Sequence, residues 1–324
     1  MDERYAVSKN YAHTFFSGRR EQPMESDQAR GVLLGLACGD ALGRPVEFVS
    51  ASEIAAQHSE LDEMVGYGTW NQPAGTITDD TEQALCIARS FVANEAFDPA
   101  DVAARFVDWY DTGPFDIGGM TRRALTRLKR GDAWNEAGQR VWEESPEGQN
   151  AGNGSVMRCP PLAIPLTTDW DRLAAASRDS SRITHADPRC TEGCVVLNLT
   201  IAGLLENAET PLQDALDYVR SDAPTELLSA LKPIVHGKQP DLKTSGYVVT
   251  SLQTALYDGL HADSATEAIV TAVNRGGDTD TIGAIAGAVA GARFGASQLP
   301  HRWLSMIDET EELETLATNI SELT

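Results

Sequence analysis

Two acidic clusters in the sequence resemble one another. They are Thr78-Asp79-Asp80-Thr81 and Gly276-Gly277-Asp278-Thr279-Asp280-Thr281. Each cluster places two aspartates beside threonines, directly before an apolar stretch with helical spacing. Four carboxylates brought together in a protein interior are costly unless a cation compensates them. Oxygen ligands suit magnesium, calcium or manganese, and four carboxylates are more than one magnesium ion usually needs. The two clusters together therefore predict a site for two divalent cations.

Helix capping is an alternative explanation for each cluster. Asp79 can act as an N-cap with Glu82 completing a capping box, and acidic residues in a first turn complement the helix dipole. Capping explains one cluster, but it does not explain why Asp278 and Asp280 repeat the arrangement behind a Gly-Gly turn. Because a helix N-terminus can also fix the orientation of a metal ligand, capping and metal binding are compatible.

The elements that must position these clusters are helical. Few stretches alternate with period two, and we predict an all-α protein of about ten or more helices. Apolar residues recur with helical spacing in 29–42, 80–93, 101–110, 120–130, 190–206, 212–220, 246–260, 264–274 and 281–294. The expected architecture is a compact orthogonal multi-helix bundle whose long loops form a metal-containing cleft. Loops this long are usually functional, and the predicted ones are 44–77, 131–156, 160–168, 180–190 and 221–246.

Two of the predicted helices carry glycine at every fourth position. Glycine costs about 1 kcal/mol relative to alanine in a helix interior, so these positions need a reason. A stripe of small residues lets another helix approach closely, and the two stripes predict a packed helix pair. If the helices pack, their ends bring Asp40 and Glu47 close to Asp278 and Asp280. The glycines are Gly31, Gly35, Gly39 and Gly43 in one helix and Gly283, Gly287, Gly291 and Gly295 in the other.

The charge balance restricts the partners. The chain of 324 residues has 48 acidic and 26 basic residues, which gives a formal net charge of −22. We therefore expect neither nucleic acid nor an anionic membrane surface as a partner. Only five of the basic residues are lysines. An acidic, lysine-poor surface indicates a halophilic microbe, with ordinary compositional drift as the alternative.

The cysteines and the chain ends indicate a cytoplasmic protein. Five cysteines are an odd number, most of them among apolar residues, so we expect reduced thiols. No signal peptide is visible, and the longest run of small apolar residues, 281–292, is too short to span a membrane. Residues 1–27 are polar and aperiodic. They predict an N-terminal extension to one all-helical domain over residues 28–324, whose oligomeric state the sequence does not indicate.

Five segments in one order carry a more specific signal than either cluster alone. They are GLACGDALGRPVE (35–47), TDDT (78–81), NGSVMR (153–158), Thr184-His185 and GGDTDT (276–281). In order and spacing, from about residue 29 to residue 295, this set resembles the ADP-ribosylglycohydrolase family.

The resemblance implies an all-helical fold with two magnesium or manganese ions at the base of a cleft. The implied activity is metal-dependent hydrolysis of the glycosidic bond to ADP-ribose, which releases ADP-ribose from a modified protein side chain or from a small molecule. By similarity, the metal ligands are Thr78, Asp79 and Asp80 on one side and Asp278, Asp280 and Thr281 on the other. All six positions are intact, which favours an active enzyme.

Two further carboxylates are candidates for the proton transfers. Cleavage of a bond to ribose builds positive charge at the anomeric carbon, and a carboxylate close to an activated water can move protons. Glu47 lies beyond a predicted helix end, and the resemblance implies that it sits at the entrance of the site. Asp116 resembles the family's aspartate-isoleucine-glycine segment. The alternatives are a solvated surface acid for Glu47 and an N-cap of the helix near Met120 for Asp116.

Candidate substrate contacts come from the glycine-rich loops. The pyrophosphate of ADP-ribose needs backbone donors, which such loops supply at helix starts, although ordinary turns are the alternative. One departure concerns adenine, because Ala151 stands where some family members carry a stacking aromatic residue. His185 is a further candidate, with packing or capping as its alternative. The full set is Asp40, Glu47, Gly118, Gly119, Asn153, Gly154, Ser155, Met157, His185, Gly276 and Gly277.

Two other functions stay open at the level of sequence. A two-metal phosphohydrolase acting on a nucleotide would use the same ligands. A non-catalytic relative, as with the crystallins that resemble the family, would keep the fold without the chemistry. The intact ligand set argues against the second, while the identity of the cleaved linkage and the choice between Mg²⁺ and Mn²⁺ are not readable from the ligands.

Overall fold

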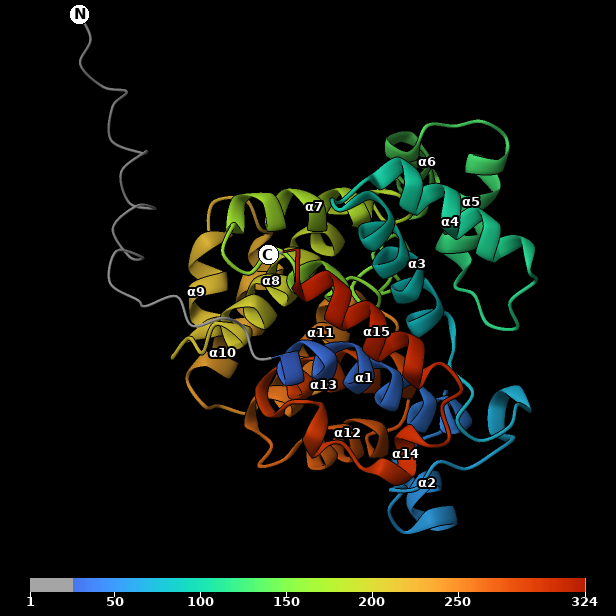
Figure 1. The fold of residues 1–324 in the computed structure, drawn as a ribbon, viewed down its shortest axis with the longest axis vertical. Helices are drawn as coiled ribbons and strands as arrows, with labels where there is room; N and C mark the ends of the chain where they lie inside the picture. The colour runs from blue at the N-terminus through green and yellow to red at the C-terminus, as the bar shows by residue number, and fades with distance from the viewer. Residues whose placement is uncertain (1–25, 324) are drawn as a thin grey trace, which may run out of the picture.

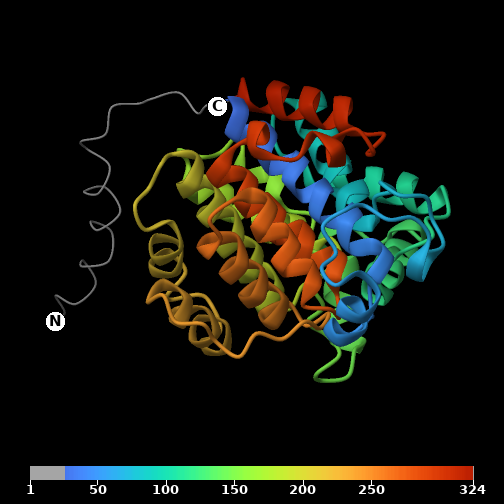
Figure 2. The same cartoon turned by 90° about the horizontal axis from the view of Figure 1, so that it is seen from below.

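The computed structural model describes residues 26–323, and over this range the chain is all-α (Figures 1 and 2). The described residues form fifteen α-helices, four short 3-10 helices and no sheet, with three isolated β-bridges between loops. The α-helices are α1 (Ser26–Gly43), α2 (Ala51–His58), α3 (Asp79–Asn94), α4 (Pro99–Asp111), α5 (Gly119–Lys129), α6 (Trp134–Glu144), α7 (Trp170–Arg182), α8 (Pro188–Leu205), α9 (Pro211–Tyr218), α10 (Thr225–Val235), α11 (Val248–His261), α12 (Ala265–Asn274), α13 (Thr279–Phe294), α14 (His301–Leu304) and α15 (Thr310–Ser321). The 3-10 helices are η1 (Arg44–Val46), η2 (Gly68–Trp70), η3 (Pro160–Ala163) and η4 (Ala296–Gln298).

All nine predicted helical segments are helices, but the loops were predicted too long. The segments 44–77, 131–156 and 221–246 contain α2, α6 and α10, and α7, α14 and α15 were not predicted. The weak signal of α2 has a physical reason, because Ile54 is its one buried residue. The helix α6 is amphipathic and buries Ala137, Gly138 and Val141, so its pattern was present in the sequence and was overlooked. The extension predicted over residues 1–27 lies outside the described residues except for Ser26 and Asp27, which begin α1.

The antiparallel pair α1 and α13 forms the centre of the molecule, and its glycine stripes face each other as predicted. A Cβ atom on Gly39 would lie 1.9 Å from the carbonyl oxygen of Gly283, and one on Gly35 would lie 2.1 Å from that of Gly287. The two backbones are therefore in direct contact, which only glycine permits. Gly295 differs from the rest of its stripe because it ends α13 with a φ of 83°.

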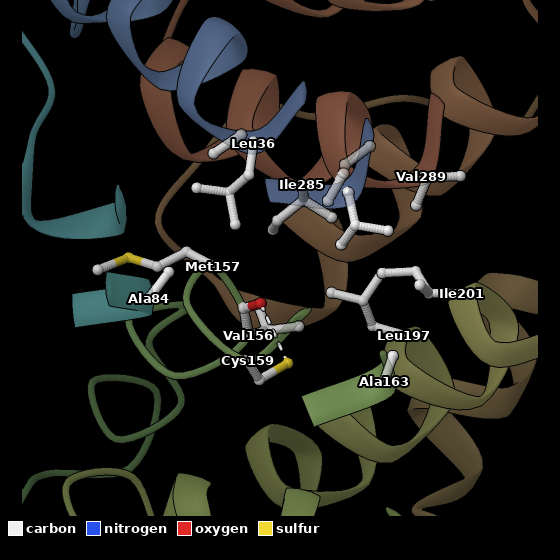
Figure 3. Close-up of a cluster of buried hydrophobic side chains, with 14 of the residues drawn as sticks. Leu36, Ala84, Val156, Met157, Cys159, Ala163, Leu197, Ile201, Ile285 and Val289 are labelled. Atoms are coloured by element: carbon white, nitrogen blue, oxygen red, sulfur yellow. Dashed lines mark hydrogen bonds between the residues drawn. The ribbon is translucent and has the colours of Figure 1, made fainter. Parts of the chain in front are cut away.

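One apolar cluster joins this helix pair to α8 and to residues 156–163. Figure 3 shows part of it. The cluster of buried apolar residues extends from Ala29 in α1 to Ile320 in α15. All five cysteines are buried and free. None of the described helices is long and apolar enough to cross a membrane.

The helix pair also sets the position of the acidic clusters. The C-terminal end of α1 meets the N-terminal end of α13, where the Thr279 hydroxyl donates to the carbonyl oxygen of Gly43 at 2.8 Å. The first turn of α3 is attached to the same end of α1, because the Thr78 amide donates to the carboxylate of Asp40 at 3.0 Å. Three chain segments far apart in sequence thus bring their acidic residues together.

Candidate metal centre

The first acidic cluster lies in the first turn of α3. Thr78 is the N-cap, and its hydroxyl donates to Asp80 Oδ2 at 3.1 Å. The capping box considered for Asp79 and Glu82 is therefore not formed. Glu82 instead accepts a hydrogen bond from Trp109 Nε1 at 2.5 Å. Asp79 and Asp80 are 6 % and 1 % exposed, so capping does not account for them.

Asp40 holds this turn in place. Its carboxylate accepts hydrogen bonds from the amides of Thr78 and Thr81 and from the Thr81 hydroxyl. The side chain is fully buried. The structure therefore places Asp40, which the sequence suggested as a substrate contact, beneath the first turn of α3 as an anchor for its backbone.

The second cluster is positioned by a glycine turn. Gly276 and Gly277 have φ values of 72° and 79°, and a Cβ atom on Gly277 would lie 2.1 Å from the carbonyl oxygen of Thr244. The Gly277 amide donates to the carbonyl oxygen of Val49 at 2.8 Å. Both glycines thus pack against other backbone segments, and they direct Asp278 into the N-cap position of α13.

The two clusters meet. The Thr281 hydroxyl lies 3.5 Å from Asp80 Oδ2, within hydrogen-bonding distance across 201 positions of sequence. Carboxylate oxygens of Glu47, Asp116 and Asp280 all lie within 4.8 Å of one another, a spacing suited to a shared cation. The structure therefore brings both predicted catalytic carboxylates and the predicted ligands into one centre.

The centre fits a cation because its buried carboxylates are not neutralised by ion pairs with described basic residues. None of the ion pairs formed by the described residues includes a carboxylate of this centre. The nearby buried Arg44 donates to backbone carbonyls, among them those of Tyr67 at 3.0 Å and Pro73 at 2.8 Å. Asp80 Oδ1 is buried without a hydrogen-bond partner. An oxygen-rich set with an unpartnered buried lone pair is what a hard divalent ion requires.

The electrostatics of the centre agree with this fit. Burial, with repulsion from Asp116 adding to it, raises the pKa of Glu47 to about 8. Burial, with repulsion from Asp40 and Asp278, raises the pKa of Asp116 to about 7. The pKa values of Asp79, Asp80 and Asp280 are raised as well, with burial as the largest cause. A bound cation would favour the ionised form of each and so oppose these shifts.

The glycine loops and His185 lie together at one side of the centre. Gly118 and Gly119 are exposed at the N-terminus of α5. A Cβ atom on Gly154 would lie 3.0 Å from the His185 ring and 3.3 Å from the Thr121 hydroxyl. The Thr121 hydroxyl is buried without a partner. Thr121 was missed in the sequence, where a threonine in a first helical turn carries no distinguishing signal.

Hydrogen bonds hold the ring of His185 in place. Arg158 donates to the Thr184 hydroxyl at 2.6 Å, and that hydroxyl is hydrogen-bonded to His185 Nδ1 at 2.7 Å. The other ring nitrogen, Nε2, faces the loop at Gly152. Burial, together with the nearby positive charge of Arg158, lowers the pKa of His185 to about 3, so the ring is neutral.

Three other predicted contacts are largely buried. Asn153 donates to Asp278 Oδ2 at 2.6 Å and so orients that carboxylate. The Ser155 hydroxyl accepts from Ser181 at 2.9 Å. The sulfur of Met157 lies 3.8 Å from the Thr281 hydroxyl. Of these, Asn153 is the most exposed, at 9 %.

Trp70 is a further residue that the sequence did not reveal. Its Nε1 donates to Glu47 Oε2 in a short hydrogen bond, and its ring centroid lies 6.0 Å from that of Phe115. Trp70 thus connects Glu47 with the segment that carries Asp116. Trp70 belongs to a predicted loop without periodicity, and nothing in the sequence of that loop indicates which residue the indole contacts.

Known proteins resemble the chain over almost its full length. The family model described as ADP-ribosylglycohydrolase matches residues 21–324. The ADP-ribosyl-[dinitrogen reductase] glycohydrolase of Rhodospirillum rubrum is 34% identical over 292 residues, which cover 90% of this chain and 94% of that protein. The ADP-ribosylarginine hydrolase Tri1 of Serratia proteamaculans is 31% identical, with 91% of this chain and 79% of that protein covered.

A solved structure shows the same likeness in three dimensions. A chain of an ADP-ribosylglycohydrolase-related protein complex superposes with a TM-score of 0.77 at 34% sequence identity. The superposition covers 93% of this chain and 99% of that chain. With the family model and the curated relatives in agreement, the protein belongs to the ADP-ribosylglycohydrolase family.

Proposed function

We propose that this protein is a metal-dependent hydrolase that cleaves the glycosidic bond to ADP-ribose and releases ADP-ribose from a modified protein side chain or a small molecule. The observation that carries the proposal is the convergence of Glu47, Asp116 and Asp280 within 4.8 Å beside the aspartates of α3. The names of the relatives, which are glycohydrolases and an ADP-ribosylarginine hydrolase, support the reaction class.

The proposed cofactor is a pair of divalent cations, Mg²⁺ or Mn²⁺. When bound, such ions would polarise ribose hydroxyls and lower the pKa of a water. Glu47 would contribute a carboxylate from the loop after η1. The six residues proposed to hold the ions are Thr78, Asp79, Asp80, Asp278, Asp280 and Thr281.

The proposed acid–base residues are Glu47 and Asp116. Carboxylate oxygens of both lie within 4.8 Å of one another and of Asp280, so each is placed to exchange a proton with a group bound at the centre. Trp70 donates to Glu47 Oε2 and so orients that carboxyl. Asn153 plays the corresponding part for Asp278, since its amide occupies Oδ2.

The diphosphate of ADP-ribose would bind where backbone amides and neutral donors converge. The N-terminus of α5 at Gly118 and Gly119 offers backbone amides and the positive end of a helix dipole. The unpartnered Thr121 hydroxyl, in the first turn of the same helix, and Nε2 of His185 both lie close to Gly154. A neutral histidine can donate a hydrogen bond from Nε2 to an anion without adding a charge.

Tyr247 is our candidate for the adenine contact that Ala151 does not supply. The Val248 amide donates to the carbonyl oxygen of Ala151 at 3.0 Å, and Gly152 pairs with Tyr247 in an antiparallel bridge. Arg189 donates to the Tyr247 hydroxyl at 3.1 Å and fixes the ring beside this loop. The aromatic residue would therefore come from the N-cap position of α11 instead of the 150–153 segment.

The cysteines and the net charge support proposals about the compartment, the source organism and the substrate. The five free, buried thiols fit a reducing compartment, and we propose a cytoplasmic enzyme. A net charge of −22 with five lysines supports a halophilic source, and it favours a protein or small molecule over nucleic acid as substrate carrier.

The test is release of ADP-ribose. Arginine- and serine-linked ADP-ribosyl peptides are incubated with the protein and Mg²⁺, and the products are separated by chromatography. We expect free ADP-ribose from the wild type and none from an Asp79→Ala/Asp278→Ala double variant. Full activity in the variant would exclude the metal assignment. AMP or phosphate as product would indicate a phosphohydrolase, and no Mg²⁺-linked binding of ADP-ribose in calorimetry with no product would indicate a non-catalytic relative.

A further inference from the structure

We infer that Phe48 and Tyr67 form an aromatic lip beside Glu47 that recognises the guanidinium group of an ADP-ribosylated arginine on a protein. This inference rests on the proposed function and names the acceptor side of its substrate. We call Phe48 and Tyr67 together the aromatic lip.

The lip is unusual first for its exposure. Among the described residues, the exposed large hydrophobic side chains are Phe48 at 69 %, Tyr67 at 67 % and Met306 at 39 %. Single exposed apolar residues are ordinary. Here, however, the two most exposed ones belong to two segments that are hydrogen-bonded to each other, because the Thr69 hydroxyl donates to the carbonyl oxygen of Glu47 at 2.7 Å.

Both residues also hold a backbone conformation that bulky side chains avoid. Phe48 has a φ of 64°, and Tyr67 has a φ of 71° with a ψ of −111°. Positive φ is a genuine outlier for a residue with a large side chain, and such strain concentrates at functional sites. Glycine would relieve the strain at either position, so the aromatic side chains need a reason other than folding.

The surrounding structure keeps the strained segments in place. The Phe48 amide donates to the carbonyl oxygen of Gly277 at 2.6 Å, directly before Asp278. The guanidinium of the buried Arg44 donates to the carbonyl oxygen of Tyr67 at 3.0 Å. The Tyr67 amide donates to the carbonyl oxygen of Gln72 at 2.5 Å. The lip is therefore attached to the same backbone that carries the candidate metal centre.

The lip lies where the chain passes from the buried carboxylates to the surface. Glu47 is 5 % exposed, and Phe48, the next residue, is 69 % exposed. Consecutive Cα atoms are only about 3.8 Å apart. Along the chain, Phe48 is therefore the first exposed residue after the buried carboxylate of Glu47.

The chemistry of the surroundings selects a cation as the occupant. A guanidinium is planar and weakly hydrated, and it stacks on aromatic faces. The carboxylates of Glu47, Asp116 and Asp280 behind the lip and the net charge of −22 attract positive charge. An arginine linked to ribose keeps its positive charge, whereas a serine hydroxyl offers the lip neither a charge nor a flat surface.

The test compares two linkages in steady-state kinetics with Mg²⁺. The substrates are a protein ADP-ribosylated on arginine and a peptide ADP-ribosylated on serine. For Phe48→Ala/Tyr67→Ala we expect the KM for the arginine substrate to rise about 3- to 30-fold, from the usual strength of cation–π contacts. We expect kcat for both substrates and KM for the serine substrate to stay within about twofold. Phe48→Tyr and Tyr67→Phe, which keep the aromatic face, should retain the wild-type KM.

Controls separate recognition from backbone effects. Met306→Ala removes an exposed apolar side chain that does not belong to the lip and should change neither KM. Phe48→Asn removes the ring but tolerates the positive φ. If Phe48→Ala raises the KM and Phe48→Asn does not, the effect comes from the backbone and the inference is wrong. An equal rise for both substrates, or no rise for either, would also overturn it.

The design distinguishes failure of the lip from failure of the proposed function. If the wild type releases ADP-ribose from the arginine substrate and the lip variants match it, only the lip inference is wrong. If the wild type releases ADP-ribose from neither substrate, the proposed function fails and the inference fails with it. Thermal melting of each variant confirms that the comparison is between folded proteins.

Discussion

The two acidic clusters have similar sequences, but the structure positions them by different means. Asp79 and Asp80 depend on side chains, since Asp40 and the Thr78 hydroxyl hold the first turn of α3. Asp278 depends on backbone, since a two-glycine turn packs against the carbonyl oxygens of Thr244 and Val49. The same kind of ligand, an aspartate, is thus positioned by side-chain hydrogen bonds in one cluster and by close backbone packing in the other. The stability of the two clusters should therefore respond differently to substitution.

The largest expected effect treats both clusters alike. Asp80→Asn and Asp280→Asn should each lower kcat/KM for ADP-ribose release roughly 100- to 1000-fold, because each removes a charge from the proposed cation site. The double variant should lose little more than either single one, since residues that act as a unit are not additive. Circular dichroism melting serves as the folding control. If either single variant kept the wild-type kcat/KM, the cluster that contains the substituted aspartate would not be part of the metal centre.

The second prediction disrupts the two-glycine turn that positions Asp278. Gly277→Ala places a methyl group 2.1 Å from the Thr244 carbonyl oxygen at a φ of 79°. We expect the free energy of unfolding to fall by about 3 kcal/mol, measured by urea titration. Gly113→Ala is the matched control, since Gly113 has a φ of 77° and no atom within 4 Å of the added Cβ. It should cost only about 1 kcal/mol. Equal losses would show that close packing contributes nothing to the turn.

The third prediction disrupts the hydrogen bonds by which Asp40 holds the first turn of α3. Asp40→Asn replaces an acceptor of three donors by an amide that is itself a donor, so it should reduce the free energy of unfolding by about 2 kcal/mol. Asp98→Asn is the control, because Asp98 caps α4 and asparagine caps as well. That variant should unfold at the same urea concentration as wild type. An Asp40→Asn protein as stable as wild type would mean that α3 holds its first turn without the anchor.

The smallest expected effect concerns the metal-free protein and pH. The pKa values of Asp116 and Glu47 are raised to about 7 and about 8 when folded, above their ordinary values. Such carboxyls stabilise the fold while protonated, so this contribution is complete at low pH and is lost as pH rises through the folded pKa. In EDTA we expect the Tm to fall by about 2 to 4 °C between pH 5 and pH 8, which corresponds to about 1 kcal/mol in the free energy of unfolding.

Magnesium should reverse that loss, and more strongly at pH 8 than at pH 5, because protons compete with the cation. Asp116→Asn should flatten the metal-free pH profile. A Tm that rises with pH in EDTA would contradict the electrostatic account of the centre.

The sequence predicted the parts of the molecule that repeat a pattern. The nine apolar-periodic helices, the α1–α13 glycine contact and the meeting of the two clusters are all present. It did not predict α7, whose surface is mostly charged and hydroxyl-bearing, or α2, which buries a single Ile54. A helix with one buried residue, such as α2, is stabilised by tertiary packing that no local window contains. The helix α7 is amphipathic, with Leu173, Ala174 and Ala176 buried, so its pattern was present and was overlooked.

The candidate site shows the same limit at the level of single residues. The clusters and the glycine loops could be found because their residue types and spacing are distinctive. Trp70, Thr121 and the anchoring role of Asp40 depend on contacts between residues tens of positions apart. Their side chains have no local signature, so only the fold reveals them.

The central claim is that both acidic clusters form one metal centre on which ADP-ribose release depends. Calorimetric titration of the EDTA-treated protein with Mn²⁺, followed by assay of the same samples on an arginine-linked ADP-ribosyl protein, tests it most directly. The account predicts two ions per chain in the wild type, weakened binding and lost release in both Asp79→Asn and Asp278→Asn, and no release without metal. Full release of ADP-ribose by the metal-free wild type, or by either variant, would contradict it.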